Sequence, residues 1–153
     1  MSAKRILVKT HPEPFLEEYP ADAAITPGHI LEINSTAEVK VHATAGGKVY
    51  ALVALENVTE GKTVTDAYAA GDQVFCAWLS PGDEFYGRAL NGENIAIGDY
   101  LESAGDGTLR KIVADTSAGT IKVGSLKFIA VQACDMSGSA GVDPSPLFRV
   151  KAI

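Results

Sequence analysis

The sequence has few of the residues on which metal and cofactor sites usually depend. Its 153 residues include two cysteines, three histidines and one tryptophan. The histidines, His11, His29 and His42, do not lie at metal-ligand spacing, and the cysteines do not form a zinc-binding pair. We therefore predict no metal site and no cofactor, and we interpret the histidines as solvated or turn residues.

Basic residues and long apolar runs are also scarce. The net charge is -6, from 19 acidic and 13 basic residues, and Lys4-Arg5 and Arg110-Lys111 are isolated basic pairs. Such a surface repels phosphate backbones, so we expect no nucleic-acid partner. No apolar run approaches the roughly 18 residues that a membrane span requires. The beginning of the chain, with only Ile6 to Val8 as an apolar run, lacks the core of a signal peptide. We expect neither secretion nor a membrane partner.

Motifs of nucleophilic catalysis and phosphate binding are absent from the sequence as well. There is no G-x-S-x-G, and Ser137 and Ser139 belong to a stretch with loop composition, "DMSGSAGVDPSP". Neither "AGDG" nor "TAGG" is followed by the lysine and helix of a phosphate loop. Cys76 and Cys134 lie in apolar runs with no neighbouring cation, which indicates buried, reduced thiols. We predict that the protein is not an enzyme.

The pattern that is present is that of β-strands. "HILEIN" (29–34) and "EVKVHAT" (38–44) alternate apolar and polar residues, and "KVYALVALE" (48–56) is typical of a strand buried on both faces. Turn residues recur about every 8–12 positions, as in a sandwich or barrel. Only Thr65 to Gly71 has the pattern of a short helix. Further strand-like runs are "DQVFCAWL", "EFYGRAL", "NIAIG", "DYLES", "TLRKI", "TIKVG", "KFIAVQACD" and "LFRVKAI".

A short repeat explains many of the acidic residues. "PGHIL", "AGDQV", "PGDEF" and "IGDYL" each place a glycine before His29, Asp72, Asp83 or Asp99, and an apolar residue follows two positions later. Glycine supplies a turn position with positive φ, and the next side chain can bond nearby backbone. We interpret each unit as a turn that leads into a strand, and "SAGDGTLRKI" as a hairpin with Asp106 at its tip. The carboxylates are thus predicted to be structural.

Residues 1–24 differ from the rest of the chain. The stretch "HPEPFLEEYPADAA" (11–24) contains three prolines and four carboxylates but few large apolar residues. Proline disfavours both helix and central strand, so this segment is predicted to be an extended arm. Residues 25–153 carry nearly all of the strand pattern. We expect them to form a single all-β domain that folds without the arm.

The arm carries the candidate contact residues. Phe15 and Tyr19 are four residues apart, which is about 13 Å in an extended chain, so their rings are expected to reach separate patches on a neighbour. Leu7 and Val8 are predicted to add an edge strand to another subunit. The alternative is that the arm is a frayed terminus.

Longer stretches carry a more specific pattern. "TPGHILE", "AYAAGDQV", "PGDE", "IAIGDYLESAGDGTLRK" and the closing "DPSPLFRVKAI" occur in this order between Ile25 and Ile153. With these motifs the chain resembles the small head decoration (capsid cement) proteins of tailed bacteriophages. Each motif is a turn followed by a strand, and it is their combination that carries the resemblance. The arm contributes least to it.

The resemblance implies a small β-barrel or β-tulip domain on the outside of an icosahedral capsid, without enzymatic activity or cofactor. It implies a homotrimer, with a dimer as the alternative, that bridges neighbouring major capsid proteins after head expansion. We therefore expect a virion structural protein on the outer capsid surface, synthesised in the host cytoplasm. Its expected partners are the major capsid protein and other copies of itself.

Three other hypotheses remain at this stage. One is a different virion β-subunit, from the tail tube or tail tip. Another is a carbohydrate-binding module, which would present exposed aromatic side chains, whereas Trp78 lies inside an apolar run. The third is a barrel enzyme that uses Asp83, Glu84 or Asp99, for which no catalytic motif is found.

Overall fold

The computed structural model describes residues 3–113, 127–138 and 145–153, and strands account for the regular structure of this part of the chain. Thirteen strands and one three-residue 3-10 helix (Val58–Glu60) are present there, which confirms the all-β prediction. The strands are β1 (Leu7–Lys9), β2 (Phe15–Pro20), β3 (Leu31–Ile33), β4 (Val39–Val41), β5 (Leu52–Ala54), β6 (Gln73–Trp78), β7 (Glu84–Arg88), β8 (Asn94–Ile95), β9 (Tyr100–Ser103), β10 (Leu109–Lys111), β11 (Phe128–Ala130), β12 (Cys134–Asp135) and β13 (Leu147–Ala152).

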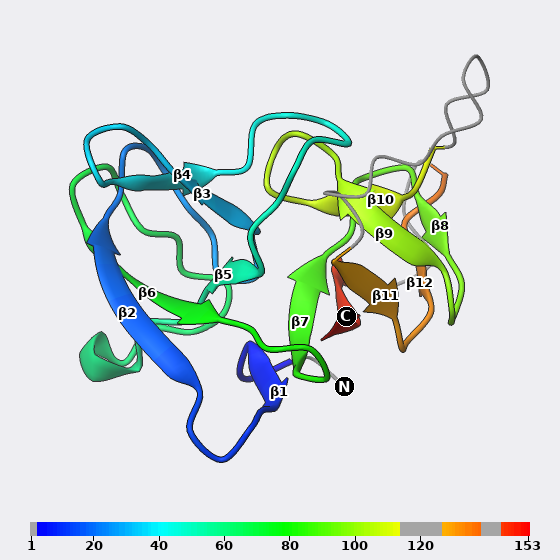
Figure 1. Ribbon diagram of the computed structural model, residues 1–153, viewed down its shortest axis with the longest axis horizontal. Helices are drawn as coiled ribbons and strands as arrows, with labels where there is room; N and C mark the ends of the chain where they lie inside the picture. The colour runs from blue at the N-terminus through cyan, green and yellow to red at the C-terminus, as the bar shows by residue number, and fades with distance from the viewer. Residues whose placement is uncertain (1–2, 114–126, 139–144) are drawn as a thin grey trace.

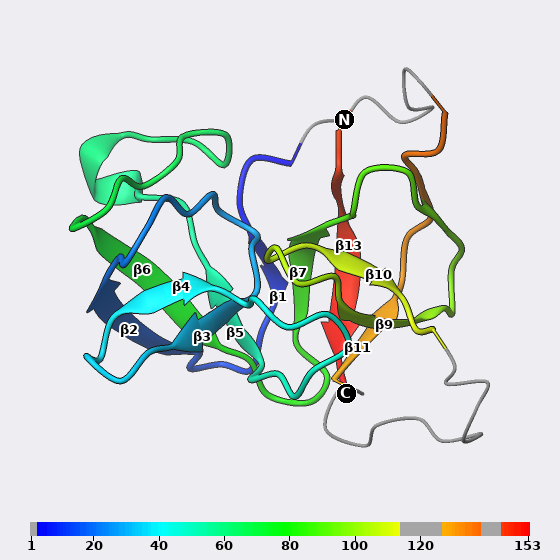
Figure 2. The same cartoon turned by 90° about the horizontal axis from the view of Figure 1, so that it is seen from above.

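The strands fall into two groups that lie side by side in Figures 1 and 2. Residues 10–80, which we call the β2–β6 half, contain the three-stranded sheet β2-β6-β5 and the hairpin β3-β4. The described residues 3–9, 81–113, 127–138 and 145–153 form the β7–β13 half, which contains the six-stranded sheet β1-β7-β13-β11-β9-β10 and the pair β12-β8. All pairings between the named strands are antiparallel.

Two hydrophobic clusters lie on opposite faces of the β5-β6 sheet. Leu52 and Ala54 belong to a smaller cluster within the β2–β6 half, whereas Val53 points the other way, into a larger cluster shared by both halves. The predicted strand buried on both faces is thereby confirmed. The larger cluster includes Phe85 and Phe128, whose ring centroids are 5.6 Å apart in an edge-to-face arrangement. This shared core fixes the two halves against each other.

The predicted glycine turns are four copies of one structure. In each, the side chain after the glycine accepts a hydrogen bond from the backbone N–H three residues earlier: Thr26 to His29 at 3.2 Å, and Ala69 to Asp72, Ser80 to Asp83 and Ala96 to Asp99 at 2.8 Å. The backbone N–H of the same residue returns a bond to the carbonyl of the earlier one. The preceding glycines have φ between 86° and 100°, a region that L-residues rarely adopt. The turns lead into β3, β6, β7 and β9.

The β9-β10 hairpin has the predicted Asp-Gly tip. Ala104 N–H donates to the Thr108 carbonyl at 2.9 Å, and Asp106 accepts from Thr108 N–H at 3.0 Å. Gly107 has a φ of 82°, and a Cβ at this position would lie 2.9 Å from Val41 and 3.0 Å from the ring of His29. Only glycine lets the tip of this hairpin pack against the β2–β6 half.

The helix predicted over residues 65–71 is wrong. Tyr68 instead pairs with Ile25 as an isolated antiparallel bridge, and its side chain is 2% exposed. Its hydroxyl donates to the Leu55 carbonyl at 2.8 Å, which satisfies the buried polar atom. The gain from burying this ring outweighs the weak local preference of a seven-residue segment for helix.

The histidine prediction is wrong at one position, and the cysteine prediction is confirmed. His42 is 3% exposed, and its Nδ1 and Nε2 lie 2.7 Å from Ser103 Oγ and the Lys48 carbonyl, so it is a core residue and not a solvated one. Cys76 and Cys134 are buried and not disulfide-bonded. Burial raises the pKa of the Cys76 thiol to about 12, which keeps it protonated and unreactive.

Two of the predicted strands do not appear as single strands in the described residues. "KFIAVQACD" was expected to be one strand, but it divides into β11 and β12, which belong to different sheets. The strand expected at "TIKVG" lies outside the described residues, as does Ser139.

Candidate interaction surface at the edge strand β2

Strand β2 lies at an open edge of its sheet. It pairs with β6 over all six of its residues, from Phe15 opposite Trp78 to Pro20 opposite Gln73. Within the described residues no strand pairs with the other side of Phe15–Pro20. The segment is extended, as predicted for the arm, but it is also a strand of a sheet. An edge of this kind presents unpaired N–H and C=O groups to a neighbour.

Two large apolar side chains project from the beginning of β2. Phe15 is 59% exposed and Leu16 is 57% exposed, and because they are consecutive in a strand they point to opposite faces. Exposed aromatic and aliphatic groups beside an open strand edge are typical of a surface that binds another chain.

Phe15 continues into a row of aromatic rings across the sheet. It lies directly opposite Trp78, whose ring centroid is 5.8 Å from that of the exposed Tyr50. Glu17 Oε2 accepts hydrogen bonds from the Trp78 indole, at 3.1 Å, and from the Tyr19 hydroxyl. The Tyr19 bond and then the Trp78 bond hold the pKa of Glu17 below its usual range. The hydrogen bonds therefore orient the Trp78 and Tyr19 rings beside a carboxylate that is charged at neutral pH.

The four residues predicted to make contacts are not equivalent in the structure. Phe15 is exposed, whereas Tyr19 packs against the smaller core cluster and Leu7 packs against the larger one. Val8 is half-buried beside Leu7 in β1. Leu7 and Val8 lie in an edge strand as predicted, and one side of this strand pairs with β7 of the same chain. That the strand also adds to another subunit stays a prediction. The Leu7 side chain packs against the larger core cluster of its own chain.

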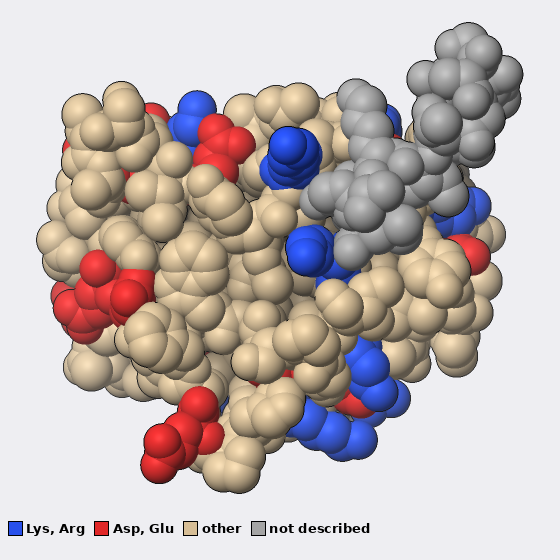
Figure 3. Space-filling model, viewed as in Figure 1, with Lys and Arg blue, Asp and Glu red and all other residues tan. Residues whose placement is uncertain are grey.

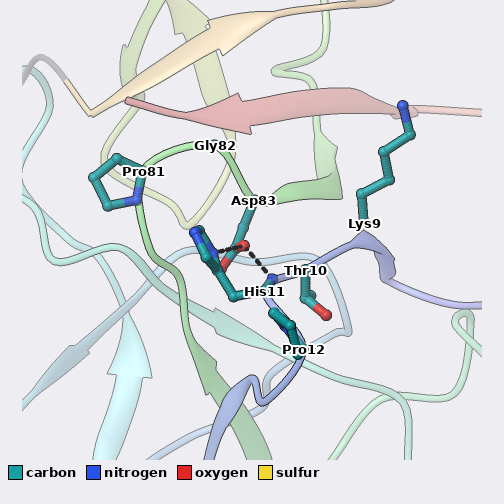
Figure 4. A pocket seen from close by; sticks show the side chains of 7 residues that line it. All are labelled: Lys9, Thr10, His11, Pro12, Pro81, Gly82 and Asp83. Carbon is teal, nitrogen blue, oxygen red and sulfur yellow. Dashed lines mark hydrogen bonds and ion pairs between the residues drawn. The ribbon is translucent and has the colours of Figure 1, made fainter.

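The loop between β1 and β2 is tied to the turn before β7, as Figure 4 shows. Asp83 Oδ1 accepts from the His11 backbone N–H at 2.9 Å and lies 2.7 Å from His11 Nδ1. Its Oδ2 accepts from Ser80 N–H at 2.8 Å, as part of the repeated turn. Burial alone would raise the pKa of Asp83, but the bonds from Ser80 and His11 hold it below its usual value.

This His11–Asp83 contact borders a cavity of about 340 Å³. An aspartate that orients a histidine is also found in hydrolases, but there the imidazole faces a nucleophile. In Figure 4 the Thr10 hydroxyl points away from the imidazole, and the other residues that line the cavity carry no hydroxyl or thiol. The arrangement supports a positioning role for the contact: it holds the arm in place between its two strands.

Charge is distributed unevenly between the two halves. Residues 10–80 contain ten carboxylates and three lysines, whereas the rest of the chain contains nine carboxylates and ten basic residues. On the face seen in Figure 3, lysine and arginine side chains gather mainly over the β7–β13 half. Strand β2, with Glu17 and Glu18, lies in the acidic half. A partner that binds this edge is therefore expected to offer basic or neutral groups.

On the other half, one buried carboxylate is shared by several cations. Glu84 in β7 is 6% exposed, and its Oε1 lies 3.4 Å from Lys151 Nζ and 3.8 Å from Lys9 Nζ. Arg149 lies 4.0 Å from Oε2. These contacts join β1, β7 and β13 across the outer face of the six-stranded sheet. Asp83, Glu84 and Asp99 were the candidate residues of the barrel-enzyme hypothesis. All three make structural contacts: Glu84 with these cations, and Asp83 and Asp99 with the backbone of their turns.

Sequence reasoning missed Leu16, Tyr50 and Trp78 as members of this surface. Leu16 is next to Phe15 in the sequence but was not predicted as a contact residue. The aromatic row could not be predicted, because it depends on pairing between Phe15 and Trp78, which are more than 60 positions apart. The period-2 pattern of "DQVFCAWL" was the available signal, since it places Trp78 on the same face as Val74 and Cys76.

Among the described residues, no three histidine, cysteine or acidic side chains are grouped closely enough to hold a metal ion. In the same part of the chain, no helix has the length and apolar character required to cross a membrane.

Comparison with known proteins adds one similarity of fold. No protein-family model matches the sequence, and no curated protein matches it. The chain is similar to the N base of the head fiber gp8.5 of bacteriophage phi29, known from its crystal structure, with a TM-score of 0.56 at 12% sequence identity. The similarity covers 92% of this chain and 95% of the other. At this identity it shows a common fold, and it extends over nearly the whole of both chains.

Proposed function

We propose that this chain is a virion structural protein that binds the outer surface of a tailed-phage capsid. The observation that carries the proposal is the similarity of fold, over almost the full length of both chains, to the base of a phage head fiber. The sequence resemblance to head decoration proteins supports the same location independently, because it rests on turn and strand motifs. In this role the protein acts by binding alone, without catalysis or a cofactor.

In finer detail, the protein reinforces the shell by bridging major capsid proteins, as a trimer at threefold positions. The open edge of β2 and the exposed Phe15 and Leu16 supply the contact to a neighbouring copy or to the capsid. Each single contact of this kind is small. Several copies held on a regular lattice nevertheless bind tightly together, because each contact raises the effective concentration of the next.

The test is direct binding to capsids of the phage that encodes the chain. Purified protein is mixed with expanded heads and with unexpanded heads, and bound protein is measured by sedimentation and electron microscopy. We expect saturable binding to expanded heads, regular density on the outer surface, and greater resistance of decorated heads to heat. Binding to isolated tails but not to heads would contradict the proposal and favour a tail subunit.

A further inference from the structure

A second cavity, of about 310 Å³, lies where the two halves of the molecule meet. It combines side chains from the turn before β3, the end of β7, the loop before β8 and the tip of the β9-β10 hairpin. Apolar and polar groups both face it, which is typical of a site for a small ligand. The residues that line it are His29, Arg88, Ala89, Leu90, Asn91, Asp106, Thr108, Met136 and Pro146.

Arg88 lines this cavity, and the backbone of the other half holds its guanidinium group. Its Nε donates to the Pro27 carbonyl at 2.7 Å, and its Nη2 donates to the Val64 carbonyl at 2.8 Å. A Cβ on Gly28 would lie 3.4 Å from Arg88 Cγ, so the side chain passes close to the turn. Burial lowers the pKa of the guanidinium, which still remains charged at neutral pH. Its Nη1 has no acceptor among the described residues and is left to donate to a ligand.

His29 supplies a second, neutral donor. Thr26 N–H donates to its Nδ1 at 3.2 Å, so the ring proton is on Nε2. Burial and then the charge of Arg88 lower the pKa of His29 to about 4, although Asp106 opposes the shift. At neutral pH the imidazole is therefore uncharged, with a fixed tautomer that presents an N–H group.

Asp106, at the tip of the β9-β10 hairpin, supplies an acceptor. Its Oδ1 accepts from the Thr108 backbone N–H at 3.0 Å and from the Thr108 hydroxyl. Its Oδ2 has no hydrogen-bond partner within the described residues. The side chain of Asn91 is also exposed at the rim, and it offers both a donor and an acceptor.

We propose that this cavity binds a small hydroxylated carboxylate, such as a sugar acid or another hydroxy acid. The ligand carboxylate lies against Arg88 Nη1 and His29 Nε2, because both donate and one is cationic. The ligand hydroxyl groups donate to Asp106, and the carbon skeleton lies against Leu90 and Met136. A neutral sugar has no carboxylate to pair with the guanidinium of Arg88, and a simple carboxylate has no hydroxyl group to donate to Asp106. The site therefore selects ligands that carry both a carboxylate and hydroxyl groups.

The test is an NMR titration of the full chain with glucuronate, glucose and acetate, followed at the side-chain signals of His29 and Asn91. Glucuronate is expected to cause saturable shifts, whereas glucose and acetate bind at least about tenfold more weakly, because each lacks one half of the recognition. Equal affinity for the three compounds, or no saturable shift with millimolar glucuronate, overturns the proposal.

Two variants complete the test. Asp106→Asn and Asn91→Ala are expected to weaken glucuronate binding at least about tenfold each, with unchanged melting temperature. The matched control is Asp66→Asn, because Asp66 is also an exposed turn carboxylate, accepting from Thr63 at 2.7 Å, but lies outside the cavity. If all three variants bind glucuronate as the parent does, the ligand does not occupy this cavity.

Discussion

Four side chains in this fold perform the same local task. His29, Asp72, Asp83 and Asp99 each accept a hydrogen bond from the N–H group three residues earlier, next to a glycine with positive φ. Such a bond fixes the direction in which the following strand leaves the turn. Two of the four have a second role. Asp83 also contacts His11, and His29 also lines a cavity. Their substitutions should therefore differ in effect.

We expect Asp83→Asn to destabilise the protein more than Asp99→Asn. Asp99 makes one exposed turn bond, so its substitution should cost about 1 kcal/mol or less. Asp83 is 3% exposed and also accepts from His11, so its substitution should cost about 2 kcal/mol. Urea denaturation of the two variants at neutral pH measures the difference. Equal losses of unfolding free energy in the two variants would mean that the His11 contact adds nothing to stability. A separate observation, that calcium stabilises the parent protein, would mean that these carboxylates bind the ion.

The half-buried imidazole of His29 should make stability depend on pH. Its pKa is about 4 in the folded protein against 6.5 as the ordinary value, so below pH 6.5 the unfolded chain binds the proton more readily. Stability is therefore lost as the pH falls from 6.5 towards 4, by at most about 3 kcal/mol. Compared with His29→Gln, the parent protein should lose roughly 2 kcal/mol more between pH 7 and pH 4.5. Parallel stability curves for the two proteins would contradict this.

At the scale of elements, the N-terminal segment supplies the edge strands of both halves. Strand β1 closes one edge of the six-stranded sheet, and β2 closes one edge of the three-stranded sheet. Ile6, just before β1, is fully buried in the larger core cluster, and its carbonyl accepts from Tyr86 N–H at 2.7 Å. The expectation that residues 25–153 fold without this segment stays a prediction, but these contacts argue against it.

Because of these contacts, we expect deletion of residues 1–20 to abolish cooperative folding. It uncovers β6 and β7 and removes Ile6, whose truncation to alanine alone is expected to cost about 2–5 kcal/mol. Thermal unfolding followed by circular dichroism, together with soluble yield, measures the effect. Ile6→Ala in the full chain is the milder companion variant, with a lower melting temperature but a cooperative transition. A truncated protein that melts like the parent would restore the original prediction.

The sequence was most informative where local chemistry decides the structure. The glycine turns and the alternating runs predicted most strands after Ile25, because positive φ and period-2 burial are visible in single residues. Proline-rich composition obscured β2, since the contacts that make it a strand come from β6, far away in sequence. The same limitation affected Tyr68 and His42. Each is drawn into the core by long-range contacts that outweigh its local pattern.

On the scale of the whole molecule, the two halves share one core but differ in charge. The β2–β6 half carries most of the excess negative charge, and the exposed Phe15 and Leu16 lie within it. Apolar groups surrounded by like charges favour contact with a basic or neutral surface and disfavour association of two such edges. Binding through β2 should therefore weaken at high salt if the capsid surface is basic.

We expect Phe15→Ala combined with Leu16→Ala to weaken capsid binding at least about tenfold while the melting temperature hardly changes. Both side chains are more than half exposed, so their removal costs little in the isolated protein. Tyr19→Ala is a poorer probe, because Tyr19 packs on the core and bonds to Glu17. Ile97→Ala is the matched control, since Ile97 is 70% exposed but lies in the turn before β9. Equal weakening by the control would show that the effect is not specific to β2.

The placement of β1 and β2 at two sheet edges also determines how the molecule responds to mechanical force. A pull on the N-terminus would meet Ile6 and then β1, so Ile6 would have to leave the shared core before the three residues of β1 separate from β7 one pair at a time. The load would then reach the His11–Asp83 contact, and only after its rupture would β2 begin to peel from β6. An anchored N-terminal segment would thus extend in two steps, and the first of them already withdraws Ile6 from the shared core.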